Sequence, residues 1–301
     1  MGSTLKELGI NLGYKCNFRC AHCSVVEDPR TKLSQKEVDL LVRIQKRYKF
    51  KSLLFVGGEP TLYIDIANSL LRKAGNLSET SVRITTNGHF ADSRDNAVKT
   101  LSEFVKLDKV QLSYDKFHAK FLPFGNIKNL YEACKALGKK FSVAMAIETP
   151  MDILLVEKIK EAGRFNIAIQ KVLPSGRAKT NHIQHPFPSL DKKVLSKGCP
   201  NRGKIMYFCG RGFSACCSSL VFNSREKSMV HPSIKEHLAS GFYKTAVLST
   251  FGRFARELGV GAGDLKPEHS APCNLCEYLF GLAGKKAKLE FTSGGRNVRR
   301  T

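Results

Sequence analysis

Three closely spaced cysteines near the N-terminus are the residues whose type and spacing point most directly to chemistry. Cys16, Cys20 and Cys23 lie in the segment YKCNFRCAHC, directly after a short apolar run. Cysteine thiolates hold iron–sulfur clusters, and a loop can wrap a cubane where a straight helix cannot. Three ligands for the four irons of a cubane leave one iron open to a further group. The spacing alone also fits a zinc site or unrelated thiols.

A second group of cysteines gathers in the last third of the chain. It consists of Cys199, Cys209, Cys216 and Cys217, followed much later by the C-x2-C pair Cys273 and Cys276. The chain has ten cysteines and no secretion signal, so a reducing compartment argues against disulfides. The C-x2-C pair predicts a tight chelating turn that needs two more thiolates to close a four-ligand site. We therefore expect a second iron–sulfur site, with closed zinc as the alternative.

Short apolar runs that alternate with helix-like segments predict the elements that position these cysteines. The strand candidates are residues 7–12, 51–56, 81–86, 109–114, 141–148 and 166–173. Ser34 and Glu37 have the spacing of a capping box at the start of the first predicted helix. Strands joined by crossover helices predict the α/β class with a parallel sheet. After Leu173 the pattern changes to Pro, Gly and polar residues, where we place a domain boundary.

The composition is strongly basic, with a formal net charge of +23. Such an excess attracts anionic partners, which include an acidic peptide, an anionic small molecule and nucleic acid. A lysine-rich solvated surface explains the charge equally well. The sequence has no apolar run of about 18 residues, so we expect a cytoplasmic protein without a membrane segment. Residues 285–301 are rich in basic side chains, and we predict a mobile tail there.

Further motifs follow at successive strand ends, and with the cysteine triplet they resemble the radical S-adenosylmethionine (SAM) superfamily. These motifs are Gly57-Gly58-Glu59-Pro60, Thr85-Thr86-Asn87-Gly88, and Ser113 with Asp115. The resemblance implies a partial (β/α)6 TIM-like barrel whose ligands gather at the carboxyl ends of the strands. It also implies that a 4Fe–4S cluster on the triplet binds SAM and cleaves it to a 5′-deoxyadenosyl radical. A complete SAM pocket argues against a nucleic-acid-binding protein.

The same resemblance implies roles for residues around the cofactor. Gly57, Gly58, Glu59 and Pro60 approach the methionine amino group, and Asn87, Ser113 and Asp115 belong to the cofactor-binding set. His22 packs near the cluster or the adenine. We interpret His118 as a capped surface residue, with a substrate-facing role as the alternative.

The distal cysteines resemble the auxiliary-cluster domain called SPASM, or its truncated twitch form. This resemblance implies one auxiliary 4Fe–4S cluster on Cys199, Cys216, Cys273 and Cys276. The turn that contains Arg177 resembles one in related enzymes, where the arginine faces a carboxylate; a surface turn is the alternative. We expect residues 1–185 to form the barrel, 186–284 the auxiliary domain and 285–301 the tail.

The segments ACCSSLVF and CNLCEYLF, with SYDKFH and GGEP, resemble radical peptide epimerases, which convert L- to D-residues in ribosomally made peptides. In those enzymes a cysteine returns a hydrogen atom to the substrate Cα, a role implied here for Cys217, with Cys209 as a competing thiol. Dehydrogenation or epimerisation of an aminoglycoside or another small molecule, and peptide thioether cross-linking, are alternatives. We expect a peptide or anionic small-molecule substrate and a one-electron reductant such as flavodoxin or ferredoxin.

Overall fold

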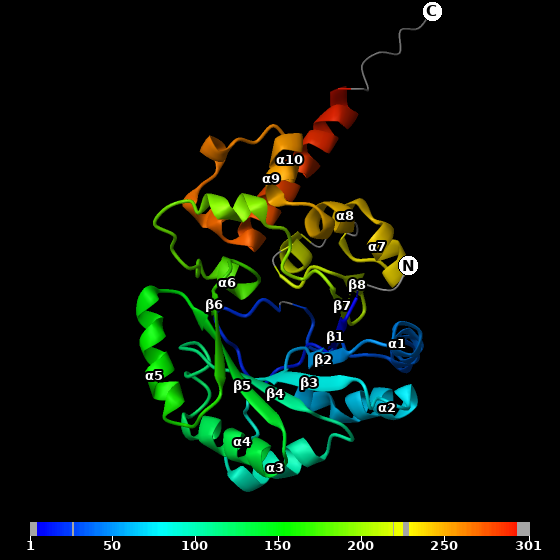
Figure 1. The fold of residues 1–301 in the computed structure, drawn as a ribbon, viewed down its shortest axis with the longest axis vertical. Helices are drawn as coiled ribbons and strands as arrows, with labels where there is room; N and C mark the ends of the chain where they lie inside the picture. The colour runs from blue at the N-terminus through cyan, green and yellow to red at the C-terminus, as the bar shows by residue number, and fades with distance from the viewer. Residues whose placement is uncertain (1–4, 26, 219, 225–228, 294–301) are drawn as a thin grey trace, which may run out of the picture.

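The first half of the chain alternates strands and helices, as the sequence predicts. A computed structural model describes residues 5–25, 27–218, 220–224 and 229–293 (Figure 1). The strands are β1 (Glu7–Asn11), β2 (Ser52–Val56), β3 (Ser81–Thr86), β4 (Lys109–Ser113), β5 (Lys140–Ile147) and β6 (Asn166–Lys171). The intervening helices are α1 (Gln35–Tyr48), α2 (Ile64–Ala74), α3 (Arg94–Ser102), α4 (Gly125–Ala136) and α5 (Leu155–Lys160). The predicted capping box at Ser34 and Glu37 is present.

The strands form one curved sheet of eight strands in the order β6-β5-β4-β3-β2-β1-β7-β8 (Figure 1). All neighbours from β6 to β1 are parallel, which confirms the α/β class and the partial barrel. Two strands were not predicted: β7 (Lys204–Phe208) pairs in parallel with β1, and β8 (Gly212–Ser214) pairs antiparallel with β7. Because parallel strands end at the same edge of a sheet, the loops after β1 to β6 meet at one mouth.

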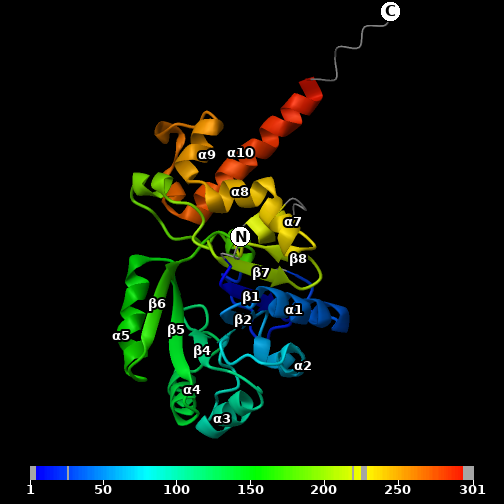
Figure 2. The ribbon, with the colours of Figure 1, turned by 45° about the vertical axis from the view of Figure 1, so that its right-hand side comes forward.

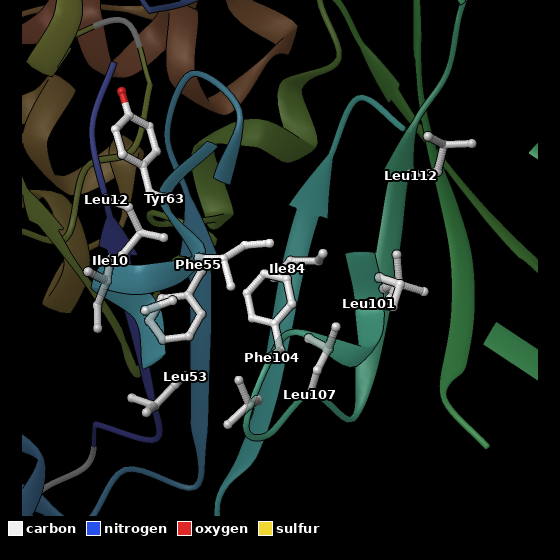
Figure 3. Close-up of a cluster of buried hydrophobic side chains, with 14 of the residues drawn as sticks. Ile10, Leu12, Leu53, Phe55, Tyr63, Ile84, Leu101, Phe104, Leu107 and Leu112 are labelled. Carbon is white, nitrogen blue, oxygen red and sulfur yellow. The ribbon is translucent and has the colours of Figure 1, made fainter. Parts of the chain in front are cut away.

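Alternate strand residues pack against the outer helices and build the main core (Figure 3). Ile10, Phe55 and Ile84 lie on three neighbouring strands and are fully buried. Leu101 of α3 and the nearby Phe104 belong to the same buried cluster. This rigid scaffold fixes the positions of the strand ends, and the site is built on them.

The short helix α6 (Arg177–Thr180) follows β6 and packs on the barrel core through Ala178. The later helices form a smaller unit above the barrel (Figure 2). They are α7 (Ile234–Ala239), α8 (Gly241–Leu248), α9 (Phe251–Glu257) and α10 (Pro272–Ser293). A second apolar cluster with Phe242, Phe251 and Leu275 holds this unit together. Val194 belongs to this second cluster, whereas Ile205 and Tyr207 of β7 belong to the barrel core. The chain after residue 185 therefore enters the second unit, returns to the first sheet at β7 and then enters the second unit again. The domain division at residue 185 stays a prediction.

Helix α10 reaches into the segment that the sequence analysis assigned to a mobile tail. Residues 285–293 are helical, and residues 294–301 lie outside the described residues. Across the described ranges, no helix combines the length and the apolarity that a bilayer-spanning segment requires.

Candidate active site

The three N-terminal cysteines lie in the loop that follows β1, at the mouth of the barrel. Cys20 is buried, and Cys16 and Cys23 are half-buried. The Phe18 amide donates to the Cys16 sulfur at 3.4 Å, and the Asn87 side-chain amide lies 3.6 Å from the same atom. Burial, followed by the neighbouring Cys23, raises the pKa of Cys20 to about 12. A raised pKa favours the protonated thiol. A bound metal ion reverses this preference, because coordination deprotonates a thiol.

The glycine pair after β2, Gly57 and Gly58, holds the start of the cysteine loop in place. The Gly58 amide donates to the Gly13 carbonyl and the Glu59 amide to the Lys15 carbonyl, both at 2.9 Å. A Cβ atom on Gly58 would lie 2.1 Å from the Lys15 carbonyl oxygen, which is backbone and cannot swing aside. Only glycine permits this approach, and the first loop cysteine follows directly after Lys15.

Replacing Gly58 with alanine is expected to lower the free energy of unfolding of the apoprotein by at least about 2 kcal/mol, because the loop entry must move aside. The variant should also retain less iron after reconstitution. Thermal unfolding and iron analysis measure both effects. Gly125→Ala is the matched control, since a Cβ there meets nothing within 4 Å. Equal stability of the two variants would contradict the fastening role of Gly58.

Glu59 lies between the ends of β2 and β3, with its side chain fully buried. Its carboxylate accepts hydrogen bonds from the Thr61 and Thr86 hydroxyls, both at 2.7 Å, and from the Asn87 amide at 2.8 Å. Burial raises the pKa of this carboxyl, and these hydrogen bonds oppose the rise. In this arrangement Glu59 joins two strand ends and positions Asn87. A direct contact between Glu59 and a cofactor stays a prediction.

The turn after β6 holds the far end of the cysteine loop. The Arg177 amide donates to the Cys23 carbonyl at 2.8 Å, and its Nε donates to the Cys20 carbonyl at 3.0 Å. The Asn181 side chain donates to the Ala21 carbonyl at 2.9 Å. Arg177 therefore positions backbone carbonyls next to two of the cysteines. From the sequence we expected a carboxylate contact or a surface turn for Arg177, and neither describes these contacts to backbone carbonyls.

Asp115 follows β4, and its carboxylate contacts two histidines next to the cysteine loop. Its carboxylate lies 3.3 Å from His22 Nε2 and 2.9 Å from His118 Nδ1. Burial alone would raise the pKa of Asp115, but hydrogen bonds from His118 and His22 outweigh it and hold the pKa well below its usual value. The interpretation of His118 as a surface residue is wrong, because its side chain is only 12% exposed. The i, i+3 spacing from Asp115 was the available signal.

His22 is held in place by the aromatic residue that follows Asp115. Its ring stacks on Phe117 with centroids 4.3 Å apart. Ser113 ends β4 and is half-buried, and Pro60 is buried at the start of a 3-10 turn, Pro60–Tyr63. The predicted cofactor residues therefore gather at one mouth of the barrel.

Buried polar atoms around this mouth suit a polar ligand. Asn11 Oδ1, His22 Nδ1 and Ser175 Oγ are buried and have no hydrogen-bond partner among the described residues. Asn11 ends β1 beside Gly57, and Ser175 lies in the turn that holds the cysteine loop. An unpartnered buried polar group costs about 1–3 kcal/mol, and a ligand with amino, carboxylate and hydroxyl groups removes that cost. These atoms fit SAM by chemical type.

The structure also brings the distal cysteines together, from three separate segments. Cys199 lies in a loop, and Cys216 and Cys217 follow the β7–β8 hairpin. Cys273 and Cys276 occupy the first turn of α10, and not the isolated turn that the sequence predicted. Burial, then Cys216, Cys199 and Cys273 in that order, raise the pKa of Cys276 well above its usual value. These four thiols are therefore close neighbours.

Cys209 and Cys134, which belong to neither proposed set of cluster ligands, do not line the cavity of the distal cysteines. Cys209 is buried directly after β7, where its carbonyl accepts a hydrogen bond from the Tyr14 hydroxyl at 3.0 Å. Cys134 is buried in α4. Cys217, in contrast, is exposed, and its sulfur accepts a hydrogen bond from the Asn201 side-chain amide at 2.9 Å. Sequence reasoning missed Asn201, and its only signal was its position two residues after Cys199.

One cavity of about 360 Å³ reaches from the distal cysteines to the N-terminal cysteine loop, which it meets at His22 and Ser24. Its barrel side includes His22 and the end of β6, and its other side includes Asn201 and Cys217. Cys199, Cys216, Cys273 and Cys276 also line it. A molecule in this cavity would lie between the residue that precedes Cys23 and the exposed thiol of Cys217.

Comparison with known proteins agrees with this geometry. The radical SAM superfamily model matches residues 10–147. A "Putative peptide biosynthesis protein YydG" of Bacillus subtilis (strain 168) is 24% identical over 93% of each chain. A "Probable GTP 3',8-cyclase" of Methanocella arvoryzae is 33% identical over 38% of this chain and 36% of its own length. The chain thus spans about a third of the cyclase.

Among solved structures, Streptococcus suis SuiB bound to the precursor peptide SuiA aligns with a TM-score of 0.45 and 19% identity. The alignment covers 73% of this chain and 61% of SuiB, so the chain spans about three fifths of that protein. The matched domain contains the cysteine loop, the glycine pair and Asp115, which are the residues gathered at the barrel mouth. Residues 10–147 are therefore a radical SAM domain.

Proposed function

We propose that this radical SAM enzyme inverts the Cα configuration of a residue in a peptide, with Cys217 as the hydrogen-atom donor. The observation that carries the proposal is a cavity lined both by His22 of the cysteine loop and by the exposed Cys217 thiol. Inversion requires that hydrogen leave one face of Cα and return to the opposite face. A radical formed at the barrel mouth and a thiol at the distal wall of the cavity would meet that requirement.

A peptide substrate is supported by two observations. The Bacillus subtilis relative, which aligns over 93% of this chain, carries the description of a putative peptide biosynthesis protein. The net charge of +23 favours acidic segments in the partner by long-range attraction. We infer a peptide with acidic residues near the inverted position.

At the barrel mouth, Cys16, Cys20 and Cys23 would hold the 4Fe–4S cluster, and Asn11, His22 and Ser175 would face SAM. Bound there, the cofactor supplies a radical that removes a hydrogen atom. Cys217 then gives its S–H hydrogen to Cα: the S–H bond breaks, the C–H bond forms, and the radical moves to sulfur. A one-electron reductant of the flavodoxin or ferredoxin class supplies the electron, and solvent supplies the proton, that restore the thiol.

We further propose that Cys199, Cys216, Cys273 and Cys276 hold an auxiliary 4Fe–4S cluster. Tetrahedral zinc with Zn–S bonds of about 2.3 Å requires sulfur atoms about 3.8 Å apart. Within the part of the chain that the structure describes, no three of these sulfur atoms lie mutually within 4.8 Å. The wider spacing suits a cubane, which places irons and sulfides between its ligands.

Two clusters predict about eight iron atoms per reconstituted chain. Replacing Cys276 with serine is expected to lower the count to about four, because one corner of the auxiliary cubane loses its thiolate, while SAM cleavage at the barrel mouth continues. Iron analysis and 5′-deoxyadenosine assays measure the two effects. Cys134→Ala, in the core of α4, is the control and should retain all the iron. About four iron atoms per wild-type chain would contradict the proposed auxiliary cluster.

The proposed function is tested on synthetic peptides with acidic segments, incubated with holoenzyme, SAM and a one-electron reductant. Chiral amino-acid analysis of the hydrolysed product should reveal one D-residue. A product that contains only L-residues and has lost two hydrogens would instead establish an oxidative reaction.

A further inference from the structure

We propose that the outer edge of β6 is a docking strand for the peptide substrate, which pairs with it as an added, extended strand. The inference rests on the proposed peptide substrate but not on the inversion chemistry. Its basis is the contrast between the two edges of the sheet.

The edge at β8 is already covered, whereas the edge at β6 is open. Next to β8, the Phe213 amide donates to the His231 carbonyl at 2.7 Å, and the His231 amide donates back at 2.9 Å. Among the strands of the described ranges, β6 pairs only with β5, and all its residues except Ile167 are exposed. Natural sheets usually protect such an edge, because its free amides and carbonyls bind other strands.

The register shows which backbone groups of β6 are free. The Val172 amide donates to the Ile147 carbonyl of β5 at 3.0 Å. In a parallel ladder, alternate residues direct both their amide and their carbonyl to the same neighbour. Ile167, Ile169 and Lys171 therefore direct theirs away from β5. Across the described residues, no backbone partner outside the sheet is found for these three.

This edge leads straight into the substrate cavity. Gln170, Lys171, Val172 and Leu173, at the end of β6 and just after it, line the cavity. At a rise of about 3.3 Å per residue, Ile169 lies roughly 13 Å before Leu173. A peptide paired along β6 would thus reach the cavity at the end of its docked segment. The enzyme would recognise that segment and modify a residue at a set distance from it.

The side chains of this edge suit an extended peptide that is partly apolar and partly acidic. Ile169 is 44% exposed, so it offers an apolar contact to a partner side chain. Lys171 is exposed at the cavity end of the strand, with its ammonium group 4.3 Å from the centre of the Phe187 ring. A second copy of this chain would bring Lys171 and the same excess of positive charge to the edge, whereas an acidic peptide complements both.

The test uses a synthetic peptide of about twelve alternating valine and glutamate residues, chosen to form a strand with negative charge. With holoenzyme, hydrogen–deuterium exchange is expected to slow at least about tenfold at the outward amides of β6. Ile169→Pro removes one outward amide without touching the β5 ladder, and proline is tolerated at an edge. It should abolish the protection, and the matched variant Ile169→Val should retain it.

Lys171→Glu provides a second variant that leaves the backbone intact, and it should weaken peptide binding at least about fivefold through charge repulsion. Unchanged exchange over residues 166–171 with the wild type, or full protection in Ile169→Pro, would overturn the proposal. Slower exchange of the β6 amides that appears without peptide and grows with protein concentration would also overturn the proposal. It would indicate that two copies of the chain associate through this edge. Docking of this peptide, together with no D-residue in the separate inversion assay, would contradict the proposed function alone.

Discussion

Replacing Cys20 with alanine is expected to lower reductive cleavage of SAM at least about a thousandfold, because the cluster at the barrel mouth loses one of its three protein ligands. Cys20 is the buried member of the triplet, and its carbonyl is held by Arg177. The loss of one thiolate therefore leaves the loop backbone in place. The measurements are 5′-deoxyadenosine formation and iron content after anaerobic reconstitution.

Cys134→Ala is a suitable control, since it removes a buried thiol that lies in α4. The Cys20→Ala variant should keep the thermal unfolding midpoint of the wild-type apoprotein, which would show that the loss is chemical. Cleavage at a wild-type rate in Cys20→Ala would contradict the assignment of the triplet.

Replacing Cys217 with alanine is expected to reduce formation of the D-residue at least about a hundredfold while SAM cleavage continues. The exposed thiol lies on the cavity wall and no other free thiol lines that wall, apart from the four proposed cluster ligands and within the described residues. Without the donor, the substrate radical has no hydrogen to take on the opposite face. Chiral analysis of the product and 5′-deoxyadenosine assays separate the two steps.

Cys209→Ala is the matched control, because that thiol is buried after β7 and does not line the cavity. It should invert the substrate at close to the wild-type rate. Inversion that persists in Cys217→Ala but is lost in Cys209→Ala would transfer the donor role to Cys209.

The barrel could be predicted from the sequence because its signals are local. Each strand is a short apolar run, and the Ser34 and Glu37 capping box lies within a single turn. Ligands at the ends of parallel strands must meet at one mouth, so the cysteine triplet, Glu59 and Asp115 could be placed near one another. The structure bears out this arrangement of the fold.

The parts that sequence could not supply depend on contacts between distant segments. Strand β7 pairs with β1, which lies nearly two hundred residues earlier in the chain. Nothing in the sequence of β7 indicates that partner. Arg177 and Asn201 each donate two hydrogen bonds to segments that only the folded chain brings next to them. The C-x2-C pair fits a turn or a helix start equally well, since i and i+3 share one helix face.

The most direct test of the central claim is the mass of the product formed in deuterated water. The Cys217 thiol exchanges its hydrogen with solvent, so inversion should add one deuterium to the peptide and place it at the Cα of the D-residue. Tandem mass spectrometry locates it there, and the Cys217→Ala variant should give no such product. A peptide that has lost two hydrogens and gained no deuterium would contradict the account.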